Sequence, residues 1–128
     1  SIQNNDSITQ EKIEYSLKLS IELSPNFTNI NKNKAVFIYA KPINSPNNMP
    51  IIVLRKTVAD LPLLVEMNDS MSMLPSNKLS DYKSVQVLAR ISNSGNAKSE
   101  KGDLIGIVES MSTTSKNITK LIINTTLK

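Results

Sequence analysis

Residues 84–110 read SVQVLARISNSGNAKSEKGDLIGIVES, and this stretch decides the fold class. Apolar residues occupy every second position of its first part, namely Val85, Val87, Ala89 and Ile91. Alternation with a period of two is typical of a β-strand that buries one face. A second apolar segment follows at 103–110, after a polar connection. The stretch therefore predicts two strands joined by a turn region.

All three glycines of the chain, Gly95, Gly102 and Gly106, fall inside this stretch. Gly95 lies between the two strands and Gly102 precedes the second strand, where tight turns need the positive φ that glycine accepts. Gly106 lies within the second strand, where a glycine marks a bulge or a close approach of another backbone. A phosphate-binding glycine loop would need a following helix, and none is predicted. We therefore expect structural roles for the three glycines.

Five further segments have the composition of strands: 15–23, 35–41, 50–57, 62–68 and 118–127. Segment 15–23 alternates strictly, and 35–41 is a continuous apolar run that suits a central strand. Prolines open two of the others, a position that a strand tolerates. About seven strands with frequent turn signals predict an all-β chain, an immunoglobulin-like antiparallel β-sandwich. Residues 1–14 are polar and predict a linker or disordered segment, so the predicted sandwich domain covers 15–128.

The composition excludes several classes of function. The chain has 128 residues, no histidine and no cysteine, which removes thiol nucleophiles, histidine bases and most zinc or haem ligation. No Ser-x-x-Lys or Gly-x-Ser-x-Gly pattern is present, so we expect no enzyme and no cofactor. The basic residues are scattered and only 4% of residues are aromatic, which argues against nucleic-acid binding. No apolar run approaches the ~20 residues of a membrane span.

Arg55 and Arg90 are the only arginines in a chain that otherwise uses lysine. Because the planar guanidinium can hold a carboxylate in a fixed geometry that lysine cannot, we expect a structural role for both. The candidate partners are Asp60, Asp69 and Asp103. The favoured interpretation is an ion pair that ties loops to the sandwich, and the alternative is partner recognition.

Met67, Met71 and Met73 form a cluster in MNDSMSM. Thioethers at such spacing can hold Cu(I). Methionine also fills irregular space under loops or offers an adaptable surface. Because no histidine or cysteine accompanies the cluster, the second interpretation is favoured and the three residues are weak metal candidates.

The sequence resembles a known family over residues 35–106. The segments that carry the resemblance follow one another in family order: VFIYAK, MPIIVLR, ADLPLLVEMNDSMSMLP, KLSDY, VQVLARISNSGNA and GDLIG. They are similar to the C-terminal periplasmic domain of c-type cytochrome biogenesis proteins of the CcmI/CycH type. The resemblance implies an immunoglobulin-like fold without catalytic residues.

The resemblance also implies a function and a location. It implies a periplasmic part of an inner-membrane-anchored protein, with the anchor outside this chain. The implied partners are apocytochrome c, components of the haem ligation complex and a helical-repeat domain of the same protein. The work expected of this domain is to help handle apocytochrome c and present it for haem ligation. The alternative is an unrelated extracytoplasmic sandwich that binds surfaces or carbohydrate, against which the absence of tryptophan argues.

The candidate partner-binding residues lie beside the glycine-bearing stretch rather than on its glycines. Met71, Lys78 and Tyr82 belong to the predicted loop between two strands. Leu88 lies on the polar face of its strand, where an apolar residue has no place in the core. We expect these four positions to be accessible to a partner.

Overall fold

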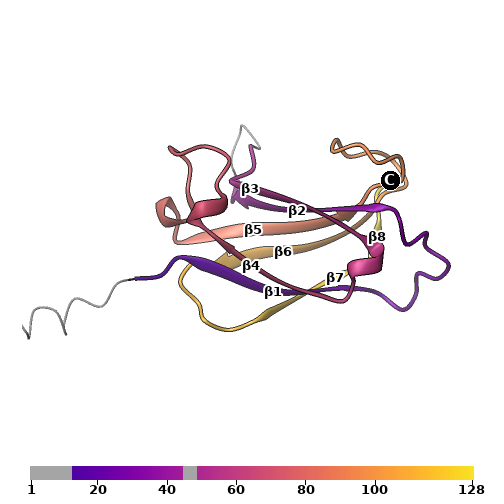
Figure 1. Ribbon diagram of the computed structural model, residues 1–128, viewed down its shortest axis with the longest axis horizontal. Helices are drawn as coiled ribbons and strands as arrows, with labels where there is room; N and C mark the ends of the chain where they lie inside the picture. Colours follow the sequence, from indigo (N-terminus) through magenta and orange to yellow (C-terminus); the bar gives the residue numbers. More distant parts are fainter. Residues whose placement is uncertain (1–12, 45–48) are drawn as a thin grey trace, which may run out of the picture.

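The computed structural model describes residues 13–44 and 49–128, and these form two β-sheets packed face to face (Figure 1). The predicted linker at 1–14 falls almost wholly outside the described residues. The strands found in the described residues are β1 (Ser16–Leu23), β2 (Ala35–Pro42), β3 (Ile52–Thr57), β4 (Leu63–Asn68), β5 (Ser84–Ile91), β6 (Leu104–Ser112), β7 (Thr119–Ile123) and β8 (Thr125–Thr126). The same residues also form three short 3-10 helices, η1 (Val58–Asp60), η2 (Asp69–Met71) and η3 (Leu79–Asp81). In the described part of the chain, no helix is long and apolar enough to cross a membrane.

The smaller sheet has the strand order β4-β1-β7, and the larger sheet has the order β3-β2-β5-β6-β8. The predicted all-β, immunoglobulin-like sandwich is confirmed. The prediction that all strand pairs are antiparallel was wrong for one pair. β1 and β7 run parallel, with Leu19 opposite Thr119. Strands far apart in sequence can pair in either direction, and the alternation of their side chains does not reveal which.

The predicted strand at 118–127 is two strands in different sheets. β7 belongs to the smaller sheet, whereas β8 pairs with β6 in the larger sheet, with Thr125 opposite Ile105. Asn124 lies between them and donates its backbone N–H to the carbonyl oxygen of Ile105 at 3.0 Å. The chain therefore changes sheet at Asn124 and joins the two layers along one edge of the sandwich.

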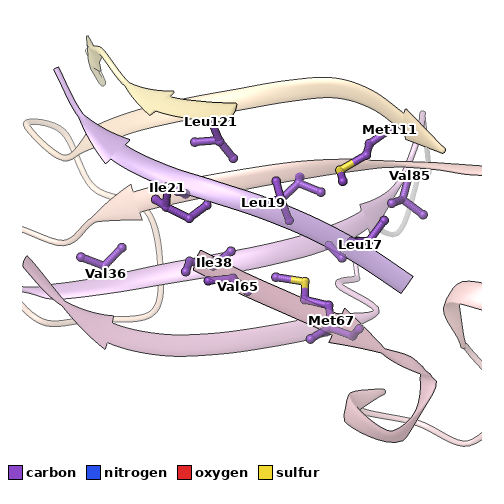
Figure 2. Close-up of a cluster of buried hydrophobic side chains, with 14 of the residues drawn as sticks. Leu17, Leu19, Ile21, Val36, Ile38, Val65, Met67, Val85, Met111 and Leu121 are labelled. Atoms are coloured by element: carbon purple, nitrogen blue, oxygen red, sulfur yellow. The ribbon is translucent and has the colours of Figure 1, made fainter. Parts of the chain in front are cut away.

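The core lies between the sheets and is built from alternate residues of each strand (Figure 2). In β1 the wholly or almost wholly buried side chains are Leu17, Leu19 and Ile21, and in β2 they are Val36, Ile38 and Ala40. Each large aliphatic side chain buried in this way contributes about 1.5–3 kcal/mol to folding. Because alternate residues of each strand point into the core, the residues between them in the larger sheet face outward.

Gly106 of β6 allows the two sheets to approach closely. A Cβ atom at this position would lie 2.1 Å from the carbonyl oxygen of Ile122 and 2.9 Å from the Cα atom of Ile123. The bulge in β6 lies elsewhere, between Val108 and Met111, where two β6 residues oppose one residue of β5. Of the two roles expected for Gly106, the structure shows the close backbone approach.

Candidate functional site

The outer face of the larger sheet carries a row of apolar side chains that crosses adjacent strands. Val53 of β3 lies opposite Tyr39 of β2, Tyr39 lies opposite Leu88 of β5, and Leu88 lies opposite Ile107 of β6. Their neighbours Ala40 and Ala89 are buried in the core, so these four side chains point away from it. Val53, Tyr39 and Leu88 are half-buried, and Ile107 is 42% exposed. We call these four residues the apolar row.

A second row on the same face is built around Phe37 of β2. Phe37 lies opposite Arg55 on one side and opposite Arg90 on the other. The guanidinium carbons of Arg55 and Arg90 are 5.9 and 5.2 Å from the centre of its ring. The rings of Phe37 and Tyr39 are stacked, with centroids 6.3 Å apart. Cation–π contacts from both arginines therefore fix the aromatic pair on the sheet.

Arg90 forms an ion pair with Asp103 at the start of β6. Its Nη1 atom is 2.8 Å from Oδ2 of Asp103, and neither side chain is exposed. Its Nη2 atom donates to the hydroxyl of Tyr39 at 2.7 Å and also to the carbonyl oxygen of Ala97. The guanidinium fork thus joins β5, β2 and the β5–β6 connection, residues 92–103, in one network.

Asp103 organises the same connection through its two carboxylate oxygens. Oδ1 accepts the backbone N–H of Asn93 at 2.8 Å, and Oδ2 accepts that of Glu100 at 2.9 Å. Burial raises the pKa of the Asp103 carboxyl, but these backbone hydrogen bonds and the adjacent Arg90 lower it by more. The net result is a pKa below the ordinary value, so the carboxylate stays charged in the folded protein.

Two glycines shape the 92–103 connection. Gly95 has a φ of 90° and Gly102 a φ of 94°, in the region that glycine adopts without steric cost. Gly95 donates its N–H to the Ser92 hydroxyl at 2.9 Å, and Gly102 donates to the carbonyl of Leu127 at 2.8 Å. These turns direct the connection back over the outer face of the larger sheet.

The connection and the sheet enclose a cleft beside the apolar row. The hydroxyl of Tyr39 donates to the carbonyl oxygen of Ala97 at 2.8 Å, which holds the connection against the end of the tyrosine side chain. The cleft has a volume of about 360 Å³. Its lining residues are Tyr39, Lys41, Pro50, Ala97, Lys98 and Ser99. Because the described residues that line it include two lysines and no carboxylate, we call it the cationic cleft.

Arg55 does not form the carboxylate pair that its residue type suggested. It is exposed on β3, and within the described residues its side chain forms no ion pair. Asp60 instead accepts the backbone N–H of Thr57 at 2.9 Å, and Asp69 accepts that of Ser80 at 3.1 Å. Backbone groups near η1 and η3 therefore occupy both carboxylates, and Arg55 packs on Phe37 instead.

The methionine cluster is divided between the core and the surface. Met67 is wholly buried and lies opposite Leu17 within the core (Figure 2). Met71 packs against the core, whereas Met73 is 57% exposed. The three thioethers therefore do not gather on one accessible surface, and the placement favours the packing interpretation over a copper site.

The four predicted partner-binding residues occupy two regions. Met71, Lys78 and Tyr82 belong to the β4–β5 connection, where Met71 and Tyr82 pack against the core and the Tyr82 hydroxyl donates to Asn77. Leu88 lies in the middle of β5, in the apolar row. Sequence reasoning missed its neighbours in that row. Leu88 could be recognised because the rest of its face in β5 is polar, whereas Tyr39 and Ile107 have further apolar residues beside them on their strands, so only the cross-strand register identifies the row.

Comparison with known proteins identifies the family of this sandwich. The family model described as "Cytochrome c-type biogenesis protein H Ig-like domain" matches residues 17–124, from β1 through β7. The chain belongs to this family. The predicted resemblance is thereby confirmed, and the match to the cytochrome c-type biogenesis family includes both strands of the hairpin at 84–110.

A curated member of the cytochrome c-type biogenesis family gives the same result. The chain is 38% identical over 95 residues to the cytochrome c-type biogenesis protein CycH of Pseudomonas aeruginosa. The aligned part covers 74% of this chain but 23% of that relative. The chain therefore spans about a quarter of the relative's length. No solved structure matches the chain.

Proposed function

We propose that this chain is a non-catalytic protein-interaction domain of a cytochrome c maturation factor. In this proposal it acts in the periplasm, as part of a protein anchored in the inner membrane. It helps to handle apocytochrome c and to present it for haem ligation. Contacts with components of the haem ligation complex and with a helical-repeat domain of the same protein belong to the same proposal.

The apolar row is the observation that supports an interaction role best. Family membership links the chain to cytochrome c biogenesis, and the row gives it a surface suited to a protein partner. Val53, Tyr39, Leu88 and Ile107 lie opposite one another in a continuous strip on the outer face of the larger sheet. Contiguous apolar surface of this kind is suited to contact with another protein.

Apocytochrome c is a partner of suitable chemistry. Without haem, its chain lacks the group around which it folds, so its apolar side chains remain accessible. An aromatic and aliphatic strip can bury such side chains through the hydrophobic effect, without a specific fold in the partner. The domain would therefore distinguish the unfolded form from folded holocytochrome c.

The test is a titration of fluorescently labelled, reduced apocytochrome c with the chain, followed by fluorescence anisotropy. Folded holocytochrome c with the same label is the matched control. We expect saturable binding of the apo form and at least about tenfold weaker binding of the holo form, a difference of ~1.4 kcal/mol. Equal binding of both forms, or none, contradicts the proposal. Binding to glycans in place of apocytochrome c would support the carbohydrate-binding alternative.

A further inference from the structure

We infer that the cationic cleft binds a carboxylate of the partner, while apolar side chains of the same partner segment cover the apolar row. The ligand is thus a peptide segment in which an acidic residue lies next to apolar residues. This inference rests on the proposed function, because it requires that the domain binds a protein segment. It adds a site and a charge preference that the interaction role does not specify.

The charge of the cleft favours an anionic group. Lys41 and Lys98 both line it, and among residues 13–44 and 49–128 no aspartate or glutamate does. The carboxylates of the nearby connection have other partners, because Asp103 is buried against Arg90 and Glu100 accepts a hydrogen bond from Asn96. A carboxylate entering between two ammonium groups would gain charge-assisted hydrogen bonds.

The wall of the cleft is held in place before any ligand arrives. Ala97, which lines the cleft, has its carbonyl oxygen bonded by both Arg90 and the hydroxyl of Tyr39. Arg90 is itself fixed by Asp103, through the ion pair of 2.8 Å between Nη1 and Oδ2. A preformed wall lowers the entropy cost of binding, because less of the site must become ordered.

Tyr39 connects the cleft to the apolar row, since its side chain belongs to both. Leu88 lies on the next strand and Ile107 on the strand after that. Adjacent strands are about 4.8 Å apart, and an extended peptide advances by about 3.3 Å per residue. Apolar residues two to four positions from the acidic residue would therefore reach Leu88 and Ile107.

The experiment uses short overlapping peptides from an apocytochrome c sequence, each acidic peptide paired with a version in which Asp or Glu is replaced by Asn or Gln. Each peptide is titrated into the ¹⁵N-labelled chain and followed by NMR. We expect acidic, apolar peptides to shift the amide signals of Tyr39, Leu88 and Lys98. Their amide counterparts should bind about tenfold more weakly, which is the loss expected for a charge-assisted hydrogen bond.

Charge reversal on the chain provides the second measurement. The double variant Lys41→Glu with Lys98→Glu should reduce acidic-peptide affinity by at least about tenfold. The matched control, Lys83→Glu with Lys116→Glu, makes the same change in net charge at exposed positions that do not line the cleft. The control variant should bind acidic peptides with nearly the affinity of the wild type. The amide spectra of both variants verify that they are folded.

The outcomes separate this inference from the proposed function. Acidic and amide peptides that bind equally, or shifts confined to the β4–β5 connection, overturn the inference even where apocytochrome c itself binds. Conversely, acidic peptides that bind in the cleft while intact apocytochrome c does not bind overturn the proposed function and leave the cleft assignment standing. Equal weakening by the test and control variants also overturns the inference, because net charge alone would then explain the effect.

Discussion

Arg90 and Asp103 form an ion pair that links β5 to the start of β6, with 2.8 Å between Nη1 and Oδ2 and no exposure of either side chain. Removing one member of such a pair leaves the other charge buried without compensation. The pair also positions the 92–103 connection, through Asn93 and Glu100 on the Asp103 side and Ala97 on the Arg90 side. The cationic cleft and the stability of the hairpin therefore depend on the same two residues.

Replacement of Arg90 by lysine should destabilise the fold. Lysine keeps the charge but cannot reach Asp103, Tyr39 and Ala97 at once, so we expect a loss of about 1–3 kcal/mol in the free energy of unfolding. Urea denaturation measures this change in the free energy of unfolding. Arg55→Lys is the control, because Arg55 is exposed and its change should stay within ~0.5 kcal/mol. Equal stability of Arg90→Lys and the wild type would contradict the role of the fork.

The Asp103 carboxyl should contribute to acid sensitivity. The pKa of this carboxyl lies below the ordinary value in the folded protein. The charged carboxylate therefore stabilises the fold fully when the pH is above the unfolded-state pKa of about 3.9. This stabilisation is lost as the pH falls through the pKa of the folded state. Asp103→Asn removes this titration. Its unfolding free energy, although lower near neutral pH, should therefore fall less steeply than that of the wild type as the solution is acidified below about pH 4. If urea denaturation showed the same dependence of the unfolding free energy on pH for Asp103→Asn and the wild type, a charged, paired Asp103 would be ruled out.

Gly106→Ala should be more damaging than substitution of a turn glycine. The added Cβ would lie 2.1 Å from the carbonyl oxygen of Ile122, a backbone atom that cannot move without shifting β7. We expect a cost of about 2–3 kcal/mol, as for other overpacked sites. At Gly95 no atom of the described residues lies within 4 Å of an added Cβ, so alanine there costs only the strain of the positive φ, about 1 kcal/mol. The melting temperatures of the two alanine variants show which substitution is more destabilising. A larger decrease for Gly95→Ala than for Gly106→Ala would refute the close-approach explanation.

Leu88→Asp should impair partner binding while the domain remains folded. Leu88 is half-buried on the outer face, so its core neighbours are undisturbed, but a charge would interrupt the apolar row. We expect at least about tenfold weaker binding of apocytochrome c, equivalent to ~1.4 kcal/mol. Leu64→Asp is the matched control, since Leu64 is 71% exposed on β4 of the smaller sheet. Equal losses in both variants would mean that the row is not the binding surface.

Most of the strands could be predicted from the sequence, because alternation and turn residues report directly on one buried face. The predicted first strand, 15–23, differs from β1 by one residue, at its beginning. The change of sheet at Asn124 could not be predicted. It depends on the pairing of β8 with β6, which involves distant residues and leaves no local pattern. The parallel pairing of β7 with β1 is hidden for the same reason.

The candidate site was only partly predictable. Leu88 was identifiable as an apolar residue on a polar face, but Val53, Tyr39 and Ile107 join it only through the register of four strands. The lysines of the cationic cleft, Lys41 and Lys98, are far apart in sequence. Both line the cleft because the 92–103 connection is held against Tyr39 at Ala97, and that position depends on the buried guanidinium of Arg90.

The most direct test of the interaction surface is an NMR footprint of intact, reduced apocytochrome c on the ¹⁵N-labelled chain. We expect the affected amides to cluster on β2, β3, β5 and β6 around Tyr39, Leu88 and Ile107. Residues of the smaller sheet, such as Leu64, should remain unaffected. A footprint on the smaller sheet or on the β4–β5 connection, with the signals of the apolar row unchanged, would show that the apolar row is not the binding surface.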